Sequence, residues 1–296
     1  MASPWDRGPR PPRPGRGGRP PEHPPRRDAP PRGTEPPAPA AAHPPRERAG
    51  DEEVAARPAR REELRLYGLN AVDAVFRRRP EAIRKLYLLQ SRIHGLKPLL
   101  AWCVQHRVGY RVVEEADLER LAGSTHHEGV VADVLRLEPR PLDEWLRALG
   151  TGTPALAIWL DGVGNPHNFG AILRSAAHFG ATVLLPADSP LALSGAAARV
   201  AEGGAEAVPL VRLPANRDAI ARLRAGGFEL DATVVRGGED LFAARLPPRL
   251  VYVMGAEGEG MDAALAAACD RRLSSPGSGA VESLHVAAPT AAHLSR

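Results

Sequence analysis

Hydrophobic positions follow two alternating periods along this chain, starting near residue 64. Short runs with the two-residue period of a strand are followed by runs with the three- or four-residue period of a helix. From residue 154 onward the strand-like runs are almost continuously apolar, which is typical of parallel strands buried on both faces. The pattern predicts the α/β fold class, with a parallel sheet covered by helices on both sides.

The C-terminal region, residues 154–296, carries the most regular pattern. Strands are expected at 155–161, 181–186, 208–213, 228–235, 249–255 and 271–275. Helices are expected at 168–180, 193–206, 216–227 and 262–270, and a short last helix is expected after Ser283, a good N-cap residue. Ligands of parallel sheets bind beyond the carboxyl ends of the strands, so the loops after these strands form the candidate site.

Residues 64–137 predict a second, smaller α/β module. Its first helix is indicated by Val72, Val75 and Phe76 at helical intervals, and Pro80 ends it. A cluster of basic side chains surrounds that helix: Arg77, Arg78, Arg79, Arg84 and Lys85. This cluster is either an ordinary solvated face or a surface that contacts RNA phosphates. Residues 138–153 predict a short helix and a Gly/Thr turn, and we interpret them as a linker.

Residues 1–61 differ from the rest of the chain because they are rich in Pro and Arg and nearly lack aliphatic side chains. Such a composition cannot bury enough apolar surface to offset the entropy lost on ordering, so we predict a disordered tail. Three roles remain open for it: a solubilising linker, an arm that touches RNA, or a segment recognised by a partner domain.

Composition adds modest constraints to this picture. The chain has 296 residues and a formal charge of +4, and its lysines are Lys85 and Lys97, so the basic excess is almost entirely arginine. Cys103 and Cys269 show no metal-ligand spacing, and a reduced, cytoplasmic protein is expected. No apolar run reaches the roughly 18 residues of a membrane helix. The adjacent His126 and His127 point in different directions, so we expect no metal site.

Three stretches carry the candidate chemistry. The first, "NPHNFGAILRSAAHFG" at 165–180, begins as a loop and places Arg174 about 200° around the helix from Ile172, away from the apolar face. Pro166 suits a helix start, and Asn168 is a plausible cap. The second, "VYVMGAEGEGM" at 251–261, surrounds Glu257 with glycines that allow close backbone approach to a ligand. The third, "SSPGSGAVESLHVAA" at 274–288, is an irregular loop leading into a helix. Each stretch alone is also compatible with an ordinary surface turn or helix.

Taken together, the three stretches resemble the SpoU/TrmH family of RNA ribose 2'-O-methyltransferases over residues 64–296. The first motif of that family, Asn and Arg separated by five residues, matches Asn168 and Arg174. The second matches residues 255–260, and the third matches Ser283, Leu284 and the two residues after them. Residues 64–137 are similar to the substrate-binding domain of the family. His285 stands where the family usually has asparagine, and Ser275 stands where it usually has an aliphatic residue.

The resemblance implies a trefoil-knotted parallel-sheet methyltransferase domain at 154–296, preceded by a small RNA-binding domain. S-adenosylmethionine would bind at Gly255, Ser275 and Leu284, and a homodimer would methylate tRNA or rRNA. Arg174 would take the proton of a ribose 2'-hydroxyl or stabilise the developing alkoxide; the second role suits a guanidinium, which keeps its proton in ordinary surroundings. The expected catalytic set is completed by Asn168, Glu257, Ser283 and His285.

Two other functions stay open at this point. A catalytically degenerate RNA-binding protein on the same fold is favoured by His285 and Ser275. The enzyme is favoured by the joint presence of four residues: Asn168, Arg174, Glu257 and Ser283. A methyltransferase acting on a base nitrogen would keep the fold but require a different acid–base group.

Overall fold

The computed structural model describes residues 63–256, 260–275 and 287–295. The predicted tail at 1–61 lies outside the described residues. Residues 56–296 form one compact unit, within which we distinguish a small domain, residues 63–135, and a large domain, residues 140–295. Within the described part of the chain, no helix is both long and apolar enough to cross a membrane.

The small domain is a four-stranded sheet in the order β1-β4-β2-β3. β1 and β2 each pair with β4 in antiparallel fashion, whereas β2 and β3 are parallel. The elements are β1 (Glu63–Tyr67), α1 (Leu69–Arg78), β2 (Ile83–Leu88), α2 (Lys97–Gln105), β3 (Gly109–Val112), α3 (Glu115–Ala122) and β4 (Val130–Leu135), with short 3-10 turns at Pro80–Ala82 and Gln90–Arg92. This arrangement confirms the α/β module expected from the sequence.

The large domain is an eight-stranded sheet in the order β10-β12-β9-β11-β6-β7-β8-β5, and its described strand pairs are all parallel. Its strands are β5 (Arg140–Pro141), β6 (Ala155–Leu160), β7 (Thr182–Leu185), β8 (Leu210–Arg212), β9 (Glu229–Thr233), β10 (Glu239–Asp240), β11 (Arg249–Met254) and β12 (Arg271–Ser274). Its helices are α4 (Leu142–Leu149), α5 (Pro166–Phe179), α6 (Gly195–Val200), α7 (Gly204–Ala207), α8 (Asn216–Ala225), α9 (Ala263–Ala268) and α10 (Ala287–Leu294).

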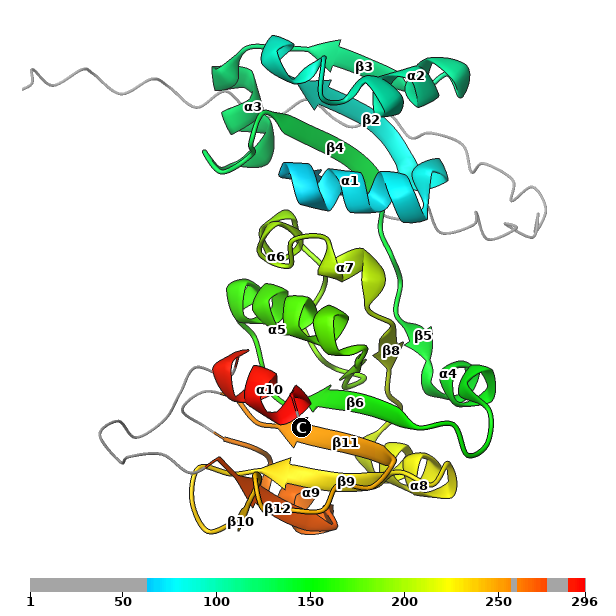
Figure 1. The fold of residues 1–296 in the computed structure, drawn as a ribbon, viewed down its shortest axis with the longest axis vertical. Coiled ribbons are helices and arrows are strands. Elements are labelled where there is room, and N and C mark those ends of the chain that lie inside the picture. Colours follow the sequence, from blue (N-terminus) through cyan, green and yellow to red (C-terminus); the bar gives the residue numbers. More distant parts are fainter. Residues whose placement is uncertain (1–62, 257–259, 276–286, 296) are drawn as a thin grey trace, which may run out of the picture. The chain divides into compact units, whose positions relative to one another are not determined.

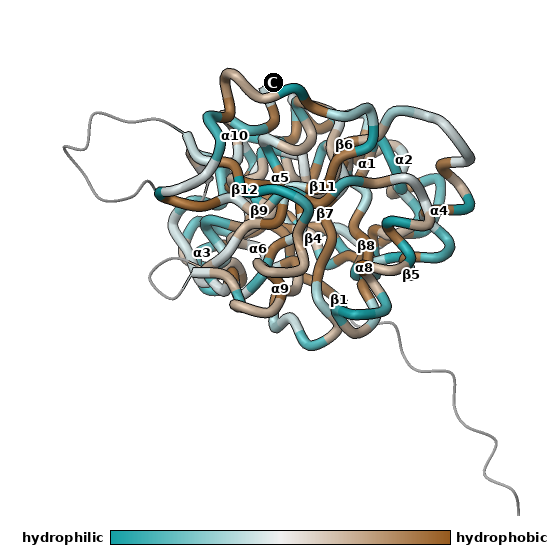
Figure 2. Tube along the Cα trace, turned by 90° about the horizontal axis from the view of Figure 1, so that it is seen from below, coloured by the Kyte–Doolittle hydropathy of each residue, from teal (hydrophilic) through white to brown (hydrophobic). Residues whose placement is uncertain are grey.

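Both faces of the large sheet are buried, as the near-continuous apolar strands predict. Alternate residues of β6 belong to two different cores: Ile158 packs on the side of α5, and Trp159 on the side of α4 and α8. The same alternation separates Tyr252 from Val253 on β11. Figure 1 shows α5 and α10 beside the central strands, and Figure 2 shows β7 as a largely hydrophobic stretch of the trace. The helices are therefore held mainly by burial of one apolar stripe each.

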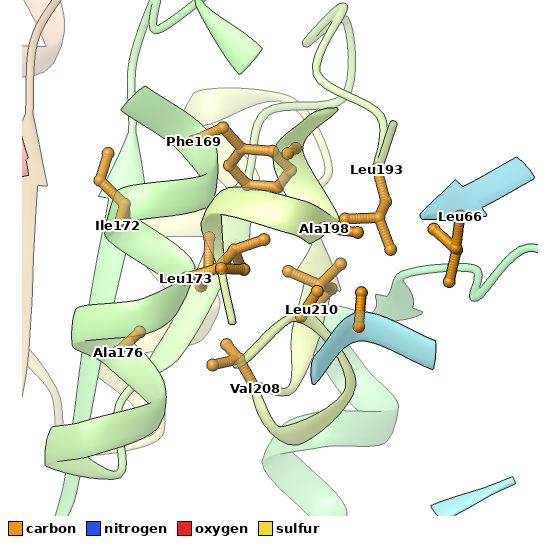
Figure 3. Close-up of a cluster of buried hydrophobic side chains, with 14 of the residues drawn as sticks. Leu66, Phe169, Ile172, Leu173, Ala176, Leu193, Ala198, Val208 and Leu210 are labelled. Atoms are coloured by element: carbon orange, nitrogen blue, oxygen red, sulfur yellow. The ribbon is translucent and has the colours of Figure 1, made fainter. Parts of the chain in front are cut away.

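Helix α5 packs most closely where its residues are small. A Cβ atom on Gly170 would lie 2.5 Å from the carbonyl oxygen of Ala197 in α6, so a larger residue would push the two helices apart. Figure 3 shows Phe169 and Leu173 of α5 among side chains from the α6–β8 region, with Leu66 of the small domain near Leu193. The first core thus runs without interruption from the large domain into the small one.

The segment interpreted as a linker packs against the large sheet. Residues 138–153 contain β5, which pairs with β8, and α4, whose Leu142 and Trp145 are buried in the second core. The guanidinium of Arg249, 7% exposed, also donates hydrogen bonds to the carbonyls of Gly150 and Thr153 at 2.5 and 2.9 Å. The sequence predicted the helix and the turn correctly, but it did not reveal their contacts with β8, with the second core and with Arg249.

The single helix expected at 193–206 is also different in the structure. It is divided into α6 and α7 by a break around Glu202 and Gly203, which both have positive φ angles, 51° and 87°. A left-handed backbone conformation ends an α-helix, and Gly203 adopts it at low cost. The apolar pattern continues through the break because α6 and α7 both bury their apolar residues in the first core.

Candidate active site

The central strands β6 and β11 are neighbours, and the helices that follow them cover opposite faces of the sheet. α5 follows β6 and lies on the first core, whereas α9 follows β11 and contributes Leu265 to the second core. The chain therefore diverges at the carboxyl ends of these two strands. In open parallel sheets such a divergence leaves a crevice in which ligands bind.

The loop after β6 leads directly into α5. Asn165 is the N-cap of this helix, and its side-chain oxygen accepts a hydrogen bond from the backbone N–H of His167 at 2.8 Å. Pro166 occupies the first helical position, as its missing N–H and fixed φ favour. The cap assigned to Asn168 is thus wrong by three residues, because Asn165 precedes the proline. Asn168 lies half-buried in the first turn, at the sheet end that bears the crevice.

The turn after β11 requires glycine at its first position. A Cβ atom on Gly255 would lie 2.5 Å from the backbone of Gly260 and Met261. Ala256 and Gly260 exchange two backbone hydrogen bonds of 2.9 and 3.0 Å across the turn. Gly255 therefore lets the chain fold back tightly at the carboxyl end of β11, which is also the geometry that brings backbone close to a ligand.

Asp161 connects the two loops, a role that the sequence did not reveal. Its backbone N–H donates to the carbonyl of Met254 at 2.8 Å, and its carboxylate accepts from the N–H of Asp262 at 2.9 Å. Asp262 in turn caps α9 through Leu265. The position of Asp161 at the end of an apolar strand was the available signal, but its partner lies 101 residues away.

The third predicted loop begins at the end of β12. Ser275 is half-buried, and its hydroxyl oxygen has no hydrogen-bond partner among the described residues. A buried hydroxyl without a partner costs free energy, so a polar ligand atom at this position would be favoured. Glu257, Ser283, Leu284 and His285 lie outside the described residues.

The last helix, α10, returns to the centre of the large domain. The hydroxyl of Thr290 lies 2.9 Å from the sulfur of Met254, and the His293 ring is edge-on to that of Tyr252 at 5.0 Å. Pro289 lies in the first turn of this helix, where proline is tolerated. Nδ1 of His293 lies 2.7 Å from the carbonyl of Pro289, and burial lowers the pKa of the ring. The helix therefore packs against Met254 and Tyr252 of β11.

Arg174 leaves the apolar face of α5 as the helical spacing predicts, and it is exposed. It borders a surface hollow of about 670 Å³, together with Asn70, His178, Phe179 and Glu202. Phe179, near the end of α5, is 37% exposed at the rim of this hollow. The hollow thus presents a cation, an anion, an imidazole and an aromatic ring to solvent.

The predicted RNA-binding cluster separates into two groups. Arg77, Arg78 and Arg84 are exposed, and Lys85 is half-buried with its Nζ 5.0 Å from the ring centroid of Tyr87. Arg79 is different, because its guanidinium donates to both carboxylate oxygens of Glu206 in α7 and to the carbonyl of Leu135. We therefore remove Arg79 from the RNA-contacting set and assign it to the contact between the domains.

One group of metal-ligating side chains is found among the described residues: Glu115, Glu119 and His127. His127 is 1% exposed, and its Nδ1 accepts a hydrogen bond from the N–H of Gly129 at 3.0 Å. A neutral imidazole with an accepting Nδ1 carries its proton on Nε2, which here lies 3.2 Å from Glu115 Oε1. While Nδ1 accepts the hydrogen bond from Gly129, Nε2 has no lone pair to offer a metal.

Comparisons with known proteins agree with both domains. Residues 155–294 match the model of the SpoU rRNA methylase family, and residues 65–140 match that of the RNA 2'-O ribose methyltransferase substrate-binding domain. The chain is 36% identical to the uncharacterised tRNA/rRNA methyltransferase YfiF of Escherichia coli O157:H7, over 78% of this chain and 66% of that protein.

Two further proteins extend the comparison. Identity is again 36% with the 23S rRNA (guanosine-2'-O-)-methyltransferase RlmB of Shewanella oneidensis, over 76% of this chain and 92% of that one. The AdoMet-bound rRNA methyltransferase of Sinorhizobium meliloti has a similar fold, with a TM-score of 0.65 and 24% identity over 78% of this chain and 85% of that one.

Proposed function

We propose, on the premise that this chain belongs to the SpoU rRNA methylase family, that it transfers a methyl group from S-adenosylmethionine to a ribose 2'-hydroxyl of tRNA or rRNA. The proposal is carried by the tight turn at Gly255, at the carboxyl end of a parallel strand where ligands bind, and by the hydroxyl of Ser275, which has no partner among the described residues. A tight glycine turn and a free polar atom both fit a ligand with polar edges such as the cofactor.

Holding the cofactor is assigned to the loops at Gly255, Ser275 and Leu284. S-adenosylmethionine supplies an electrophilic methyl group on sulfur. The chain's own contribution is to place the ribose oxygen in line with that methyl group and to exclude water, which alone accounts for several kcal/mol of barrier reduction. The bound cofactor would supply the methyl group and leave as the neutral thioether, and the ribose hydroxyl would give up its proton to solvent water.

Arg174 is proposed to stabilise the negative charge that develops on the ribose oxygen. A guanidinium keeps its proton in ordinary surroundings, so it acts as a donor of charge-assisted hydrogen bonds more readily than as a base. Asn168, Glu257, Ser283 and His285 are proposed, from the family resemblance, to orient Arg174 and the ribose. The same resemblance leads us to propose a homodimer in the cytoplasm and a trefoil knot formed by the C-terminal segment; the packing of α10 against α5 and β11 supports the knot.

Calorimetry and product analysis test this function. The full chain should bind S-adenosylmethionine and should add 2'-O-methyl groups to RNA from a strain that lacks the gene, measured by mass spectrometry of nucleosides. No binding at millimolar cofactor would favour the degenerate RNA-binding protein. Methylated bases with unmodified riboses would favour a base-nitrogen enzyme.

The exposed part of the basic cluster should contribute to RNA binding through phosphate contacts. Replacing both Arg78 and Arg84 by alanine should reduce the slope of log affinity against log salt by about two, because each phosphate contact releases roughly one counterion. Filter binding to bulk tRNA at several salt concentrations measures this slope. Arg222→Ala is the matched control, since Arg222 pairs with Asp143 on the far face of the large sheet. If the wild-type chain, the double variant and Arg222→Ala have equal salt slopes, the cluster is an ordinary solvated face.

A further inference from the structure

Two strained carboxylate-bearing residues meet at one arginine. Among the described residues other than glycine, positive φ angles occur at Arg107, Glu128 and Glu202. Glu128 of the small domain and Glu202 of the large domain both bind Arg199, with N–O distances of 2.6 and 2.5 Å. A left-handed conformation costs a side-chain-bearing residue about 1–2 kcal/mol and persists where surrounding contacts enforce it. The strain therefore marks this junction as a constrained part of the molecule.

The chain passes through a narrow gap immediately after Glu202. A Cβ atom on Gly203 would lie 3.1 Å from the Cβ of Ala74 in α1, and one on Gly204 would lie 3.1 Å from the Cα of Arg174 in α5. The two glycines thus face the helices of different domains, and neither position has room for a side chain. This passage places Glu202 between the small domain and the helix that carries Arg174.

Two groups donate hydrogen bonds to the carboxylate of Glu202. Its two oxygens accept hydrogen bonds from the amide of Asn70 in α1 and from Arg199. Glu202 is also the one acidic side chain among the described residues that border the hollow containing Arg174. A carboxylate has about four acceptor positions, so its existing partners leave capacity for a further donor.

The charge of Arg174 is felt at this carboxylate. The pKa of Glu202 is lowered, chiefly by the hydrogen bond from Asn70, then by Arg199, with a smaller contribution from the positive charge of Arg174. Arg174 and Glu202 both border the hollow, so the guanidinium and the carboxylate face the same solvent-filled space.

We propose that Glu202 is a positioning residue for Arg174, and that Asn70 holds Glu202 in place for this task. The proposal rests on the catalytic role proposed above for Arg174. The hydrogen bond from Asn70 to Glu202 would couple the position of α1 to the orientation of Arg174. The same helix carries the exposed Arg77 and Arg78. A shift of α1 on RNA binding thereby changes the orientation of the Arg174 guanidinium.

The first test needs no RNA. Carbon-13 NMR titration of the Glu202 carboxyl in the full chain, assigned with Glu202→Gln, should give a pKa below the usual range of glutamate. Arg174→Ala should raise this pKa by several tenths of a unit, because a nearby positive charge is removed. Arg217→Ala, an exposed arginine of α8 on the opposite face of the sheet, should leave it unchanged. An unchanged pKa in Arg174→Ala would overturn the proposal.

The second test separates positioning from stability. With tritiated S-adenosylmethionine and unmodified tRNA and 23S rRNA transcripts, Glu202→Gln should lower kcat roughly tenfold and leave cofactor affinity and the KM for RNA within about threefold. Asn70→Ala should act in the same direction, and the double variant should be no worse than Glu202→Gln. Glu128→Gln is the matched control, because it removes the other carboxylate from Arg199 but does not border the hollow.

The outcomes distinguish the two proposals. If Arg174→Ala is inactive while Glu202→Gln and Glu128→Gln have equal turnover, the positioning role is refuted and the function stands. If the wild-type chain transfers no methyl group, the proposed function fails; if Arg174→Ala has full activity, the function stands but the roles proposed for Arg174 and Glu202 both fail. The NMR titration then still decides whether Glu202 and Arg174 interact.

Discussion

Arg174→Ala should lower the rate of methyl transfer by at least about 100-fold while the affinity for S-adenosylmethionine changes only a few-fold. The reason is that a charged donor aimed at a developing alkoxide acts in the transition state, where loss of one such donor typically costs two to three orders of magnitude. Single-turnover transfer to RNA measures the rate, and calorimetry measures the affinity. A loss in rate without a loss in binding identifies an interaction made in the transition state.

Arg174→Lys and Arg217→Ala are the controls for this result. Lysine keeps the charge but not the planar fork of donors, so Arg174→Lys should recover part of the rate. Arg217 is equally exposed but lies on α8, on the other face of the sheet, so Arg217→Ala should transfer methyl groups at the wild-type rate. Full turnover in Arg174→Ala would remove this residue from the mechanism.

Arg79→Ala should destabilise the protein by about 3–5 kcal/mol, the usual loss when one partner of a buried ion pair is removed. Side-chain exposure is 15% for Arg79 and 3% for Glu206, so the remaining carboxylate would be buried without its partner. The carbonyl of Leu135 would lose its donor as well. Because the pair joins α1 to α7, urea denaturation should show the loss together with a looser contact between the domains.

Arg77→Ala is the matched control on the same helix. Arg77 pairs with Asp73 at 2.7 Å, but its side chain is 74% exposed, and such surface pairs contribute at most about 1 kcal/mol. Its replacement should therefore leave stability nearly unchanged. Replacing Arg79 by methionine and Glu206 by leucine should recover much of the loss, because no charge is then left buried. Equal stabilities of Arg77→Ala and Arg79→Ala would contradict the structural role of the pair.

Arg77 and Arg79 illustrate which roles can be predicted from the sequence and which require the structure. In the sequence both arginines belong to one basic run, and nothing local distinguishes them. Only the distant Glu206, 127 residues further along, identifies Arg79 as structural. The cap of α5 was misassigned for a different reason, because Asn165 and Asn168 are both good cap residues and the proline between them decides the outcome.

By itself the sequence determined the class of fold, the strands and most of the helices, because apolar periodicity directly reflects which side of an element is buried. It also determined the family, through short motifs at the ends of strands. Tertiary structure alone decided that 138–153 packs on the sheet, that one expected helix breaks at Glu202, that Asp161 connects two loops, and that Asn70 and Glu202 border the same hollow as Arg174. These features depend on contacts between residues far apart in the chain, and such contacts leave no periodic pattern in the sequence.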